Sequence, residues 1–484
     1  RNLGGIEHVI WANRSKKPIR TDMPLGEVLE STKRYEALMV PIIPNDPGSP
    51  WMQVTPSTTN VARKLVSGRQ YYKAHEGVNT ALKQVYHVSV LDKLPDGRLR
   101  ITNPLEPGQK KRVKQVEDVV EPDLVYPLVR GRDVKRWYVG YKDRYAIVPH
   151  DPKTGKPLPE KDLKVKLPLT YDYLNTYRKE LENRRIHKLW GKGNPFYSIY
   201  DIGSYTFVPY KVVWKNIAGA STGKAKLSCA VIGDIEDSFL GKKVVIPDIK
   251  IMLVPLSSAE EAYYLAGVLN STLIRSIVAS YGIATGISTH ILDFIKVPKY
   301  DPENGLHRSV SELSKRAHEL AREIYGRGRT DLEGELRRVE DKIDIDVAKL
   351  FGMLEAELKE FKKLLAMLSG EELSEEEEEV VIPERPIINV LNTSLQPNTP
   401  SYVEVDVVNP SGEGVVFTYE LPWGRSSFSV VEGRYRIPTP PLEPGRYRGV
   451  LKWVWRGEES SLDIVIDVSE PVGPKRRRSL LDFG

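Results

Sequence analysis

The chain has 484 residues, 40% of them hydrophobic, and a formal net charge of +6. This length and composition predict about three domains with hydrophobic cores and exclude a largely disordered chain. Cys229 is the only cysteine, which excludes a disulfide framework and a thiolate zinc site and leads us to expect a cytoplasmic protein. No apolar run approaches the roughly 18–20 residues of a membrane helix, and the histidines lack metal-ligand spacing, so we expect neither membrane nor metal.

Residues 1–59 mix polar stretches with turns that are rich in proline. The sequence begins with arginine rather than methionine. We therefore expect this stretch to be a wrapping segment or the tail of a catalytic domain that precedes the sequence.

Residues 60–303 contain short apolar or alternating runs, which are typical of strands in a mixed sheet. The longer run Glu260–Ala279 predicts a helix, because its apolar residues recur on one face. This block is therefore predicted to be an α+β domain. The expected strands are Val85–Val90, Tyr145–Val148, Lys211–Trp214, Ala230–Gly233 and Lys250–Val254.

Residues 127–137 (PLVRGRDVKRW) alternate four cations with apolar residues around a glycine. Such a segment can bury one side against a core and direct its cations at an anionic partner. The guanidinium group of arginine matches phosphate oxygens or the O6/N7 edge of guanine. Together with the basic net charge, this segment points to recognition of DNA.

Residues 304–370 carry apolar residues at helical spacing in three successive sets, and the third set is close to a heptad pattern. We expect an antiparallel helical hairpin that packs on its own domain, in preference to an intermolecular coiled coil. The glutamate-rich residues 371–382 are expected to form a solvated acidic linker.

Residues 383–470 alternate apolar and polar positions between turns of proline and glycine, which predicts a small antiparallel β-sandwich. Residues 442–447 (LEPGRY) are similar to the turn and tyrosine that enter a late strand of immunoglobulin-like folds. We expect an interaction or spacer module here, because the segment contains no recognisable catalytic constellation.

Residues 471–484 form a basic tail. Within it, Leu480 and Phe483 have the spacing found in short tails that dock on sliding clamps, so a sliding clamp is one candidate partner. The preferred interpretation is a disordered tail that adds non-specific affinity for DNA.

Several short motifs follow one another in a characteristic order between residues 60 and 353. They are Gly77–Thr80 before a strand, the cationic segment 127–137, Tyr205–Phe207 before the run Tyr210–Trp214, the helical run Tyr264–Ser271, Val297-Pro298 and the helical run Glu340–Gly352. This order resembles the C-terminal part of adenine-specific DNA methyltransferases, including those fused to restriction enzymes. In that family the region holds the TaqI-like specificity domain, also called the target recognition domain.

The resemblance implies that this block closes over double-stranded DNA, opposite a catalytic domain that acts in cis or in trans. Some cations would then contact phosphates and others the bases, while exposed aromatic rings would stack on the DNA or wedge into it. The expected contacts are the cations Arg130, Arg132, Lys135, Arg136, Lys211 and Lys215 and the aromatic residues Trp190, Tyr197 and Tyr205.

The chain departs from the family at Ala81, where family members commonly have glycine, and at Lys83, where asparagine is common. The nearest match to the catalytic loop that grips a flipped adenine is Asn194–Tyr197, but its third residue is phenylalanine and a basic stretch precedes it. Since a glycine-rich cofactor loop is also not recognisable, we assign these residues no catalytic role. S-adenosylmethionine is expected to bind the catalytic domain and not this chain.

The leading hypothesis is sequence-specific DNA recognition by the specificity region of an S-adenosylmethionine-dependent adenine-N6 DNA methyltransferase or of a bifunctional restriction–modification protein. The alternative is a non-catalytic specificity or scaffold subunit of a multi-protein DNA-defence complex. The resemblance covers the middle of the chain and not the C-terminal β-sandwich.

Overall fold

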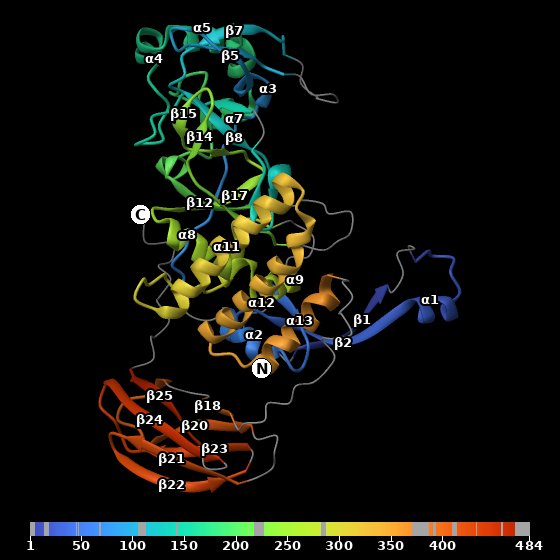
Figure 1. Cartoon of the computed structure of the whole chain (residues 1–484), viewed down its shortest axis with the longest axis vertical. Helices are drawn as coiled ribbons and strands as arrows, with labels where there is room; N and C mark the ends of the chain where they lie inside the picture. The colour runs from blue at the N-terminus through green and yellow to red at the C-terminus, as the bar shows by residue number, and fades with distance from the viewer. Residues whose placement is uncertain are drawn as a thin grey trace, which may run out of the picture. The chain divides into compact units, whose positions relative to one another are not determined.

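The chain forms two compact units, residues 1–373 and 374–484, and each is described by itself (Figure 1). The structure is a computed structural model. The predicted acidic linker, residues 371–382, and the basic tail with its candidate sliding-clamp motif, residues 471–484, lie outside the described residues. The described residues are 5–13, 19–44, 46, 48–66, 69–104, 113–141, 144–216, 227–281, 287–369, 387–390, 394–408, 414–431, 433–455 and 458–469.

Helices and sheets combine in the first unit, as the predicted α+β class requires. Two sheets form its framework, a six-stranded sheet of order β16-β8-β11-β5-β6-β7 and a four-stranded sheet of order β13-β12-β17-β4. Their paired strands run antiparallel, except that β16 is parallel to β8. The strands are β4 (His75–Glu76), β5 (His87–Lys93), β6 (Leu99–Thr102), β7 (Glu117–Val120), β8 (Val125–Val129), β11 (Tyr145–Ile147), β12 (Tyr210–Lys215), β13 (Cys229–Ile232), β16 (Ile246–Pro247) and β17 (Ile251–Leu256).

The predicted strands are confirmed with one change. Val85 and Tyr86 belong to a helical turn that precedes β5, whereas the other predicted runs match β5, β11, β12, β13 and β17. One hydrophobic core lies between the six-stranded sheet and short helices of the first unit. These helices and the neighbouring α7 are α3 (Lys83–Tyr86), α4 (Glu160–Lys166), α5 (Pro168–Thr176), α6 (Arg178–Glu182) and α7 (Arg185–Trp190).

A second core joins the four-stranded sheet to the long helices and to an N-terminal sheet of order β1-β2-β3. The helices predicted in residues 304–370 therefore pack within their own unit, and α11 lies against both α8 and α12. The elements around this core are β1 (Ile6–Asn13), α1 (Leu25–Ser31), β2 (Thr32–Pro41), β3 (Trp51–Val54), α2 (Thr59–Val66), α8 (Ala259–Asn270), α9 (Thr272–Tyr281), α10 (Ile291–Phe294), α11 (Gly305–Arg327), α12 (Glu333–Leu350) and α13 (Glu355–Ser369).

The single helix predicted over Glu260–Ala279 is in fact two helices, α8 and α9, which are separated by Ser271 in an extended conformation. The buried amide of Asn270 bonds both backbone groups of Cys229, each at 2.8 Å. Asp344 accepts the first N–H of α9 at 2.7 Å. These polar contacts with distant strands and helices break the helix, and the local apolar pattern could not reveal them.

The second unit contains two sheets around one hydrophobic core, as predicted for a β-sandwich. The predicted tyrosine turn is also present, because the Tyr447 hydroxyl donates a hydrogen bond to the Glu443 carbonyl oxygen at 2.9 Å. The sheets have the orders β18-β20-β23 and β19-β25-β24-β21-β22. The strands are β18 (Ile387–Val390), β19 (Ser394–Leu395), β20 (Ser401–Val408), β21 (Val415–Leu421), β22 (Gly424–Val430), β23 (Gly433–Thr439), β24 (Gly445–Trp455) and β25 (Glu458–Val468).

The loop before α3 explains why glycine would suit position 81. Ala81 has a φ angle of +54°, in the left-handed region that a side chain disfavours, and its N–H donates to the Asn79 side chain at 3.1 Å. The loop is further fixed by two backbone hydrogen bonds between Asn79 and Tyr200, at 2.8 and 3.0 Å. Ala81 therefore keeps a conformation that costs free energy.

We predict that Ala81→Gly stabilises the first unit by about 0.5–1 kcal/mol, because relief of the left-handed strain outweighs the entropy that glycine adds to the unfolded chain. Urea denaturation of both proteins measures the difference. The matched control is Ala356→Gly in α13, which removes a methyl group from an exposed position in a helix and should destabilise by about 1 kcal/mol. Equal destabilisation by both changes would contradict the prediction.

Candidate nucleic-acid interface

The fold divides the four cations of segment 127–137 between the surface and the interior. Arg132 lies in the turn η1 (Gly131–Asp133) and Lys135 in β9 (Val134–Lys135), and both side chains are exposed. Arg130 is buried and Arg136 is half-buried. The alternation in the sequence therefore does not place all four cations on one surface.

Arg136 forms a structural ion pair. Its Nη1 atom lies 3.0 Å from Oε1 of Glu340 in α12, and its Nη2 donates to the Asn270 carbonyl oxygen at 3.1 Å. The same Glu340 oxygen accepts the Nε1–H of buried Trp137 at 2.6 Å. Because these contacts engage the guanidinium inside the protein, we correct the expectation for Arg136 and leave it out of the interface.

Arg130 lines a narrow basic recess together with Lys83 and Arg144. Its backbone N–H donates to the Asp133 carboxylate at 2.9 Å, which ties the two ends of the turn η1 together. Burial raises the pKa of neighbouring Asp248, and the charge of Arg130 opposes that rise. Arg130 therefore belongs to a recess with several cations and is not a solvated surface residue.

Three segments that each carry a cation adjoin at Gly131. A Cβ atom built on this glycine would lie 3.3 Å from the Cβ of Lys250 and 3.6 Å from the Cβ of Lys215. Lys215 ends β12, Lys250 directly precedes β17, and β12 pairs with β17 so that Lys215 lies opposite Ile251. We call Arg132, Lys215 and Lys250 the Gly131 cluster. No local pattern in the sequence singles out Lys250, because its place follows from strand pairing.

Lys135 extends this charged surface toward α11. Its Nζ atom lies 4.2 Å from the centre of the Tyr325 ring, while the side chain stays exposed. A cation–π contact at an exposed site stabilises by only about 0.5–1 kcal/mol, so Lys135 can leave the ring for a phosphate at small cost.

Lys211 occupies the buried middle of β12. Its side chain is 0% exposed, and its ammonium group donates to the Val208 carbonyl oxygen at 2.7 Å. Burial lowers the pKa of Lys211 to about 7, an effect that Asp234 only partly opposes. A phosphate cannot reach this group while β12 keeps its place, so we correct the expectation and leave Lys211 out of the interface.

The three aromatic candidates differ in exposure. Tyr197 is fully buried, and its hydroxyl donates to the Leu158 carbonyl oxygen at 2.8 Å, so we correct the expectation that it stacks on DNA. Tyr205 is half-buried and stacks on His75 at 4.0 Å between ring centres. Trp190 is 73% exposed and remains the candidate for contact with bases.

Helix α7 presents Trp190 within a second basic surface. Leu189 beside it is 62% exposed, and the cations Arg185, Lys188 and Lys192 are exposed as well. Exposed apolar side chains among cations are typical of elements that wedge into nucleic acid. We call these five residues the α7 surface.

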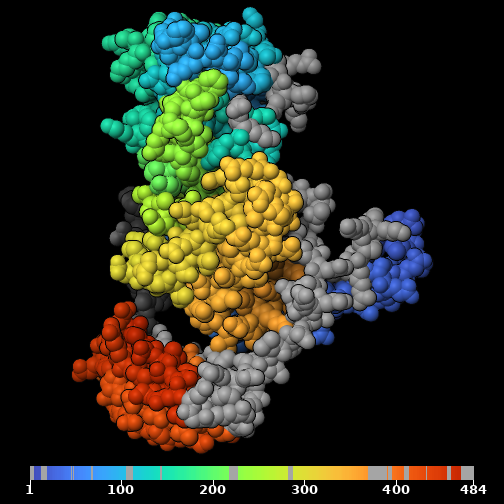
Figure 2. All heavy atoms as spheres, in the orientation of Figure 1, coloured from blue at the N-terminus to red at the C-terminus, as the bar shows by residue number. Residues whose placement is uncertain are grey.

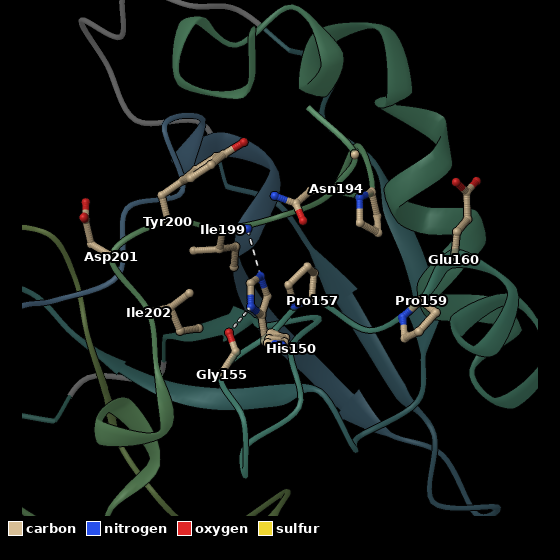
Figure 3. A pocket seen from close by; sticks show the side chains of 13 residues that line it. His150, Gly155, Pro157, Pro159, Glu160, Asn194, Ile199, Tyr200, Asp201 and Ile202 are labelled. Carbon is tan, nitrogen blue, oxygen red and sulfur yellow. Dashed lines mark hydrogen bonds between the residues drawn. The ribbon is translucent and has the colours of Figure 1, made fainter. Parts of the chain in front are cut away.

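An open hollow of about 900 Å³ lies next to α7 (Figure 3). His150 supports its floor, because its Nε2 accepts the Ile199 N–H and its Nδ1 bonds the Gly155 carbonyl oxygen, each at 2.9 Å. Burial lowers the pKa of His150 to about 4, so the ring is neutral at physiological pH. The hollow is lined by His150, Gly155, Lys156, Pro157, Pro159, Glu160, Gly193, Asn194, Pro195, Ile199, Tyr200, Asp201 and Ile202.

The buried side chain of Arg184 joins segments next to this hollow. Its Nε donates to the Leu181 carbonyl oxygen at 2.9 Å, its Nη1 to that of Thr80 at 2.8 Å and its Nη2 to that of Phe196 at 2.6 Å. Hydrogen bonds from a charged group contribute about 1.5–3 kcal/mol each. Sequence analysis missed Arg184, since nothing local separates it from the exposed Arg185.

The aromatic residues of the segment Asn194–Tyr197 cannot stack on a flipped base as those of a catalytic loop do. Phe196 and Tyr197 are buried in the core of the six-stranded sheet, and Asn194 is exposed at the rim of the hollow. Among the described residues there is no cluster of three or more potential metal ligands, and none of the helices there is long and apolar enough to span a membrane.

We predict that Lys211→Met makes the first unit more stable than the wild type, with the largest difference at and below pH 7. The pKa of Lys211 is about 7 in the folded protein and 10.5 in the unfolded chain. Between pH 7 and pH 10.5 the unfolded chain therefore binds more protons than the folded protein, and the stability of the wild type rises with pH over this range. The difference should shrink by about 1.4 kcal/mol for each pH unit above 7.

Urea denaturation at pH 7 and pH 9 measures this difference. Lys215→Met is the matched control, because it makes the same substitution at the half-buried end of the same strand. A difference for Lys211→Met that stays constant with pH would show that the ammonium group is not desolvated.

No known protein-family model matches the chain. Over 163 residues the chain is 29% identical to the Type II methyltransferase M.NspV of Nostoc sp. (strain ATCC 29411 / PCC 7524). The matched stretch makes up 33% of this chain and 30% of that protein, so the chain spans less than a third of the length of the relative. Part of this chain is therefore similar to part of a Type II methyltransferase.

Proposed function

We propose that this chain recognises a DNA sequence as the specificity region of an adenine-N6 DNA methyltransferase or of a bifunctional restriction–modification protein. The observation that carries the proposal is the Gly131 cluster, in which three segments that each carry a cation adjoin at one glycine, in a chain of which a third is similar to part of a Type II methyltransferase. Lys135 and the recess around Arg130 add charge on either side of the same turn.

This arrangement suits double-stranded DNA. The Gly131 cluster sits where β12 and β17 are paired, so the sheet holds the backbone beneath its cations fixed. Phosphate contacts from such a framework set the register of a duplex, and residues in adjoining hollows or loops can then read bases. Arg132 offers a bidentate fork for a phosphate or a guanine, whereas Lys215 and Lys250 supply point charges.

Methyl transfer and binding of S-adenosylmethionine are assigned to a separate catalytic domain, in cis or in trans. The hairpin of β1 and β2 offers that domain exposed apolar side chains, since Val9 and Trp11 lie on one face of β1 and are 52% and 45% exposed. In Figure 2 this hairpin stands out from the rest of the first unit. Exposed apolar patches of this kind are typical of surfaces that bind another protein domain.

We predict that replacing Arg132, Lys135, Lys215 and Lys250 together by glutamine weakens binding to DNA by about 10- to 100-fold at moderate salt. The salt dependence of log K should flatten by about one for each phosphate contact that is lost. Fluorescence anisotropy with a duplex selected from a random pool, measured across a salt series, gives both quantities.

The matched control replaces four exposed cations of α11 and α12, namely Lys315, Arg337, Arg338 and Lys342, by glutamine. This control removes the same formal charge and should bind nearly as well as the wild type. If both sets of substitutions weakened DNA binding equally, the binding would depend on net charge alone and not on the proposed interface. Wild-type affinity in a folded variant of the first set would refute the proposed interface.

A further inference from the structure

The hollow beside α7 has the size and the walls of a binding site for a small planar group. Its volume of about 900 Å³ falls within the range of roughly 300–1,000 Å³ that is usual for such sites. The Tyr200 ring, Pro157 and Ile202 supply flat or apolar wall, and Asn194 supplies an amide with a donor and an acceptor (Figure 3).

The carboxylates at the edge of the hollow are already engaged. Asp201 accepts from the Asn79 amide at 3.1 Å, and Glu160 is paired with Arg178 and accepts from the Tyr171 hydroxyl. Arg178 therefore balances the charge of Glu160, whereas Asp201 is bonded by a neutral amide and keeps its negative charge at the edge of the hollow. Lys156 adds an exposed cation at the rim.

Two hydrogen bonds couple the hollow to α7. His187 of α7 shares a hydrogen bond with the Tyr200 hydroxyl at 2.9 Å, and the Asn194 N–H donates to the Gly191 carbonyl oxygen at 2.8 Å. The exposed tip formed by Leu189 and Trp190 is thus held at a fixed place relative to the hollow. An apolar tip that unstacks bases and an adjoining hollow that can hold one are complementary features.

The backbone around the hollow is strained, as is common at functional sites. Asp201 has a φ angle of +51°, although it is not a glycine. Gly155 adopts its φ of +68° without strain because it is a glycine, and the close approach of Gly203, whose Cα would lie 2.3 Å from a Cβ built on Gly155, also requires glycine there. Strain such as that at Asp201 persists only where the surrounding structure enforces it, here by the bonds of Asn79 to Asp201 and to Tyr200.

We propose that this hollow holds one base that the Leu189–Trp190 tip displaces from the DNA stack. The inference rests on the proposed function and deepens it. The base would stack on the Tyr200 ring and bond the Asn194 amide, which matches a donor–acceptor pair on a base edge. Because the adenine to be methylated would enter the catalytic domain, the base held here is a second displaced base, and its recognition contributes to sequence specificity.

The test places 2-aminopurine at each position, in turn, of the duplex selected from a random pool. This base fluoresces when it leaves the stack. With protein at saturating concentration, one position outside the adenine to be methylated should brighten severalfold in the wild type. A mismatch at that base pair should tighten binding on the order of tenfold, because the pair no longer has to be broken.

The Trp190→Ala and Asn194→Ala variants, each at a concentration that saturates the duplex, should show no increase in 2-aminopurine fluorescence. Neither variant should bind the mismatched duplex more tightly than the matched one. Both side chains are exposed, so neither change disturbs the core. Matched controls are Val165→Ala, which truncates an apolar residue that is 75% exposed, and Asn183→Ala, which removes an exposed amide. Both controls should brighten like the wild type.

A wild type that binds the selected duplex without brightening at any such position overturns the inference and leaves DNA recognition standing. Brightening that persists in both variants also overturns it, because the base would then be held elsewhere. Failure of the wild type to bind duplexes from the pool would refute the proposed function and this inference together.

Discussion

The buried guanidinium of Arg184 is the constraint on which the geometry of the candidate site depends. It donates to the carbonyl oxygens of Leu181, three residues before it, of Phe196, twelve residues after it, and of Thr80, which is 104 residues away in the sequence. Two tyrosine rings lie within 5.9 Å of its charged carbon. A desolvated cation with unsatisfied donors would cost several kcal/mol, so the three segments must remain where they complete its hydrogen bonds.

One consequence concerns the short loop from Gly77 to Ala81, which connects two parts of the site. On one side its backbone bonds Pro247 and Ile251 next to the Gly131 cluster, and on the other side it bonds Tyr200 in the wall of the hollow. Arg184 fixes the middle of the same loop through Thr80. The backbone hydrogen bonds of this loop therefore connect the cluster to the wall of the hollow.

The sequence predicted the elements well but could not predict the directions of the cations. Period-two runs located the strands, and proline–glycine turns located the sandwich and its tyrosine, because these signals are local. Lys211 and Lys215 lie on the same face of β12, but Lys211 belongs to the buried stretch of the strand, where Val213 packs in a core with residues of other segments, and Lys215 stands at its half-buried end. Burial of Lys211 and the approach of Lys250 to Gly131 follow from pairing between distant strands, which single-sequence patterns do not encode.

The division of cations bears on how such a surface could discriminate between sequences. Arg136 is neutralised by Glu340, and burial lowers the pKa of Lys211 to about 7, so neither adds much to the field that a duplex would meet. Attraction to phosphates does not depend on sequence, and every cation added to the surface strengthens all sites alike. Basic charge that is placed inside the fold does not add to this attraction, which is the same for every DNA sequence. A larger share of the binding free energy can then come from contacts that depend on the bases.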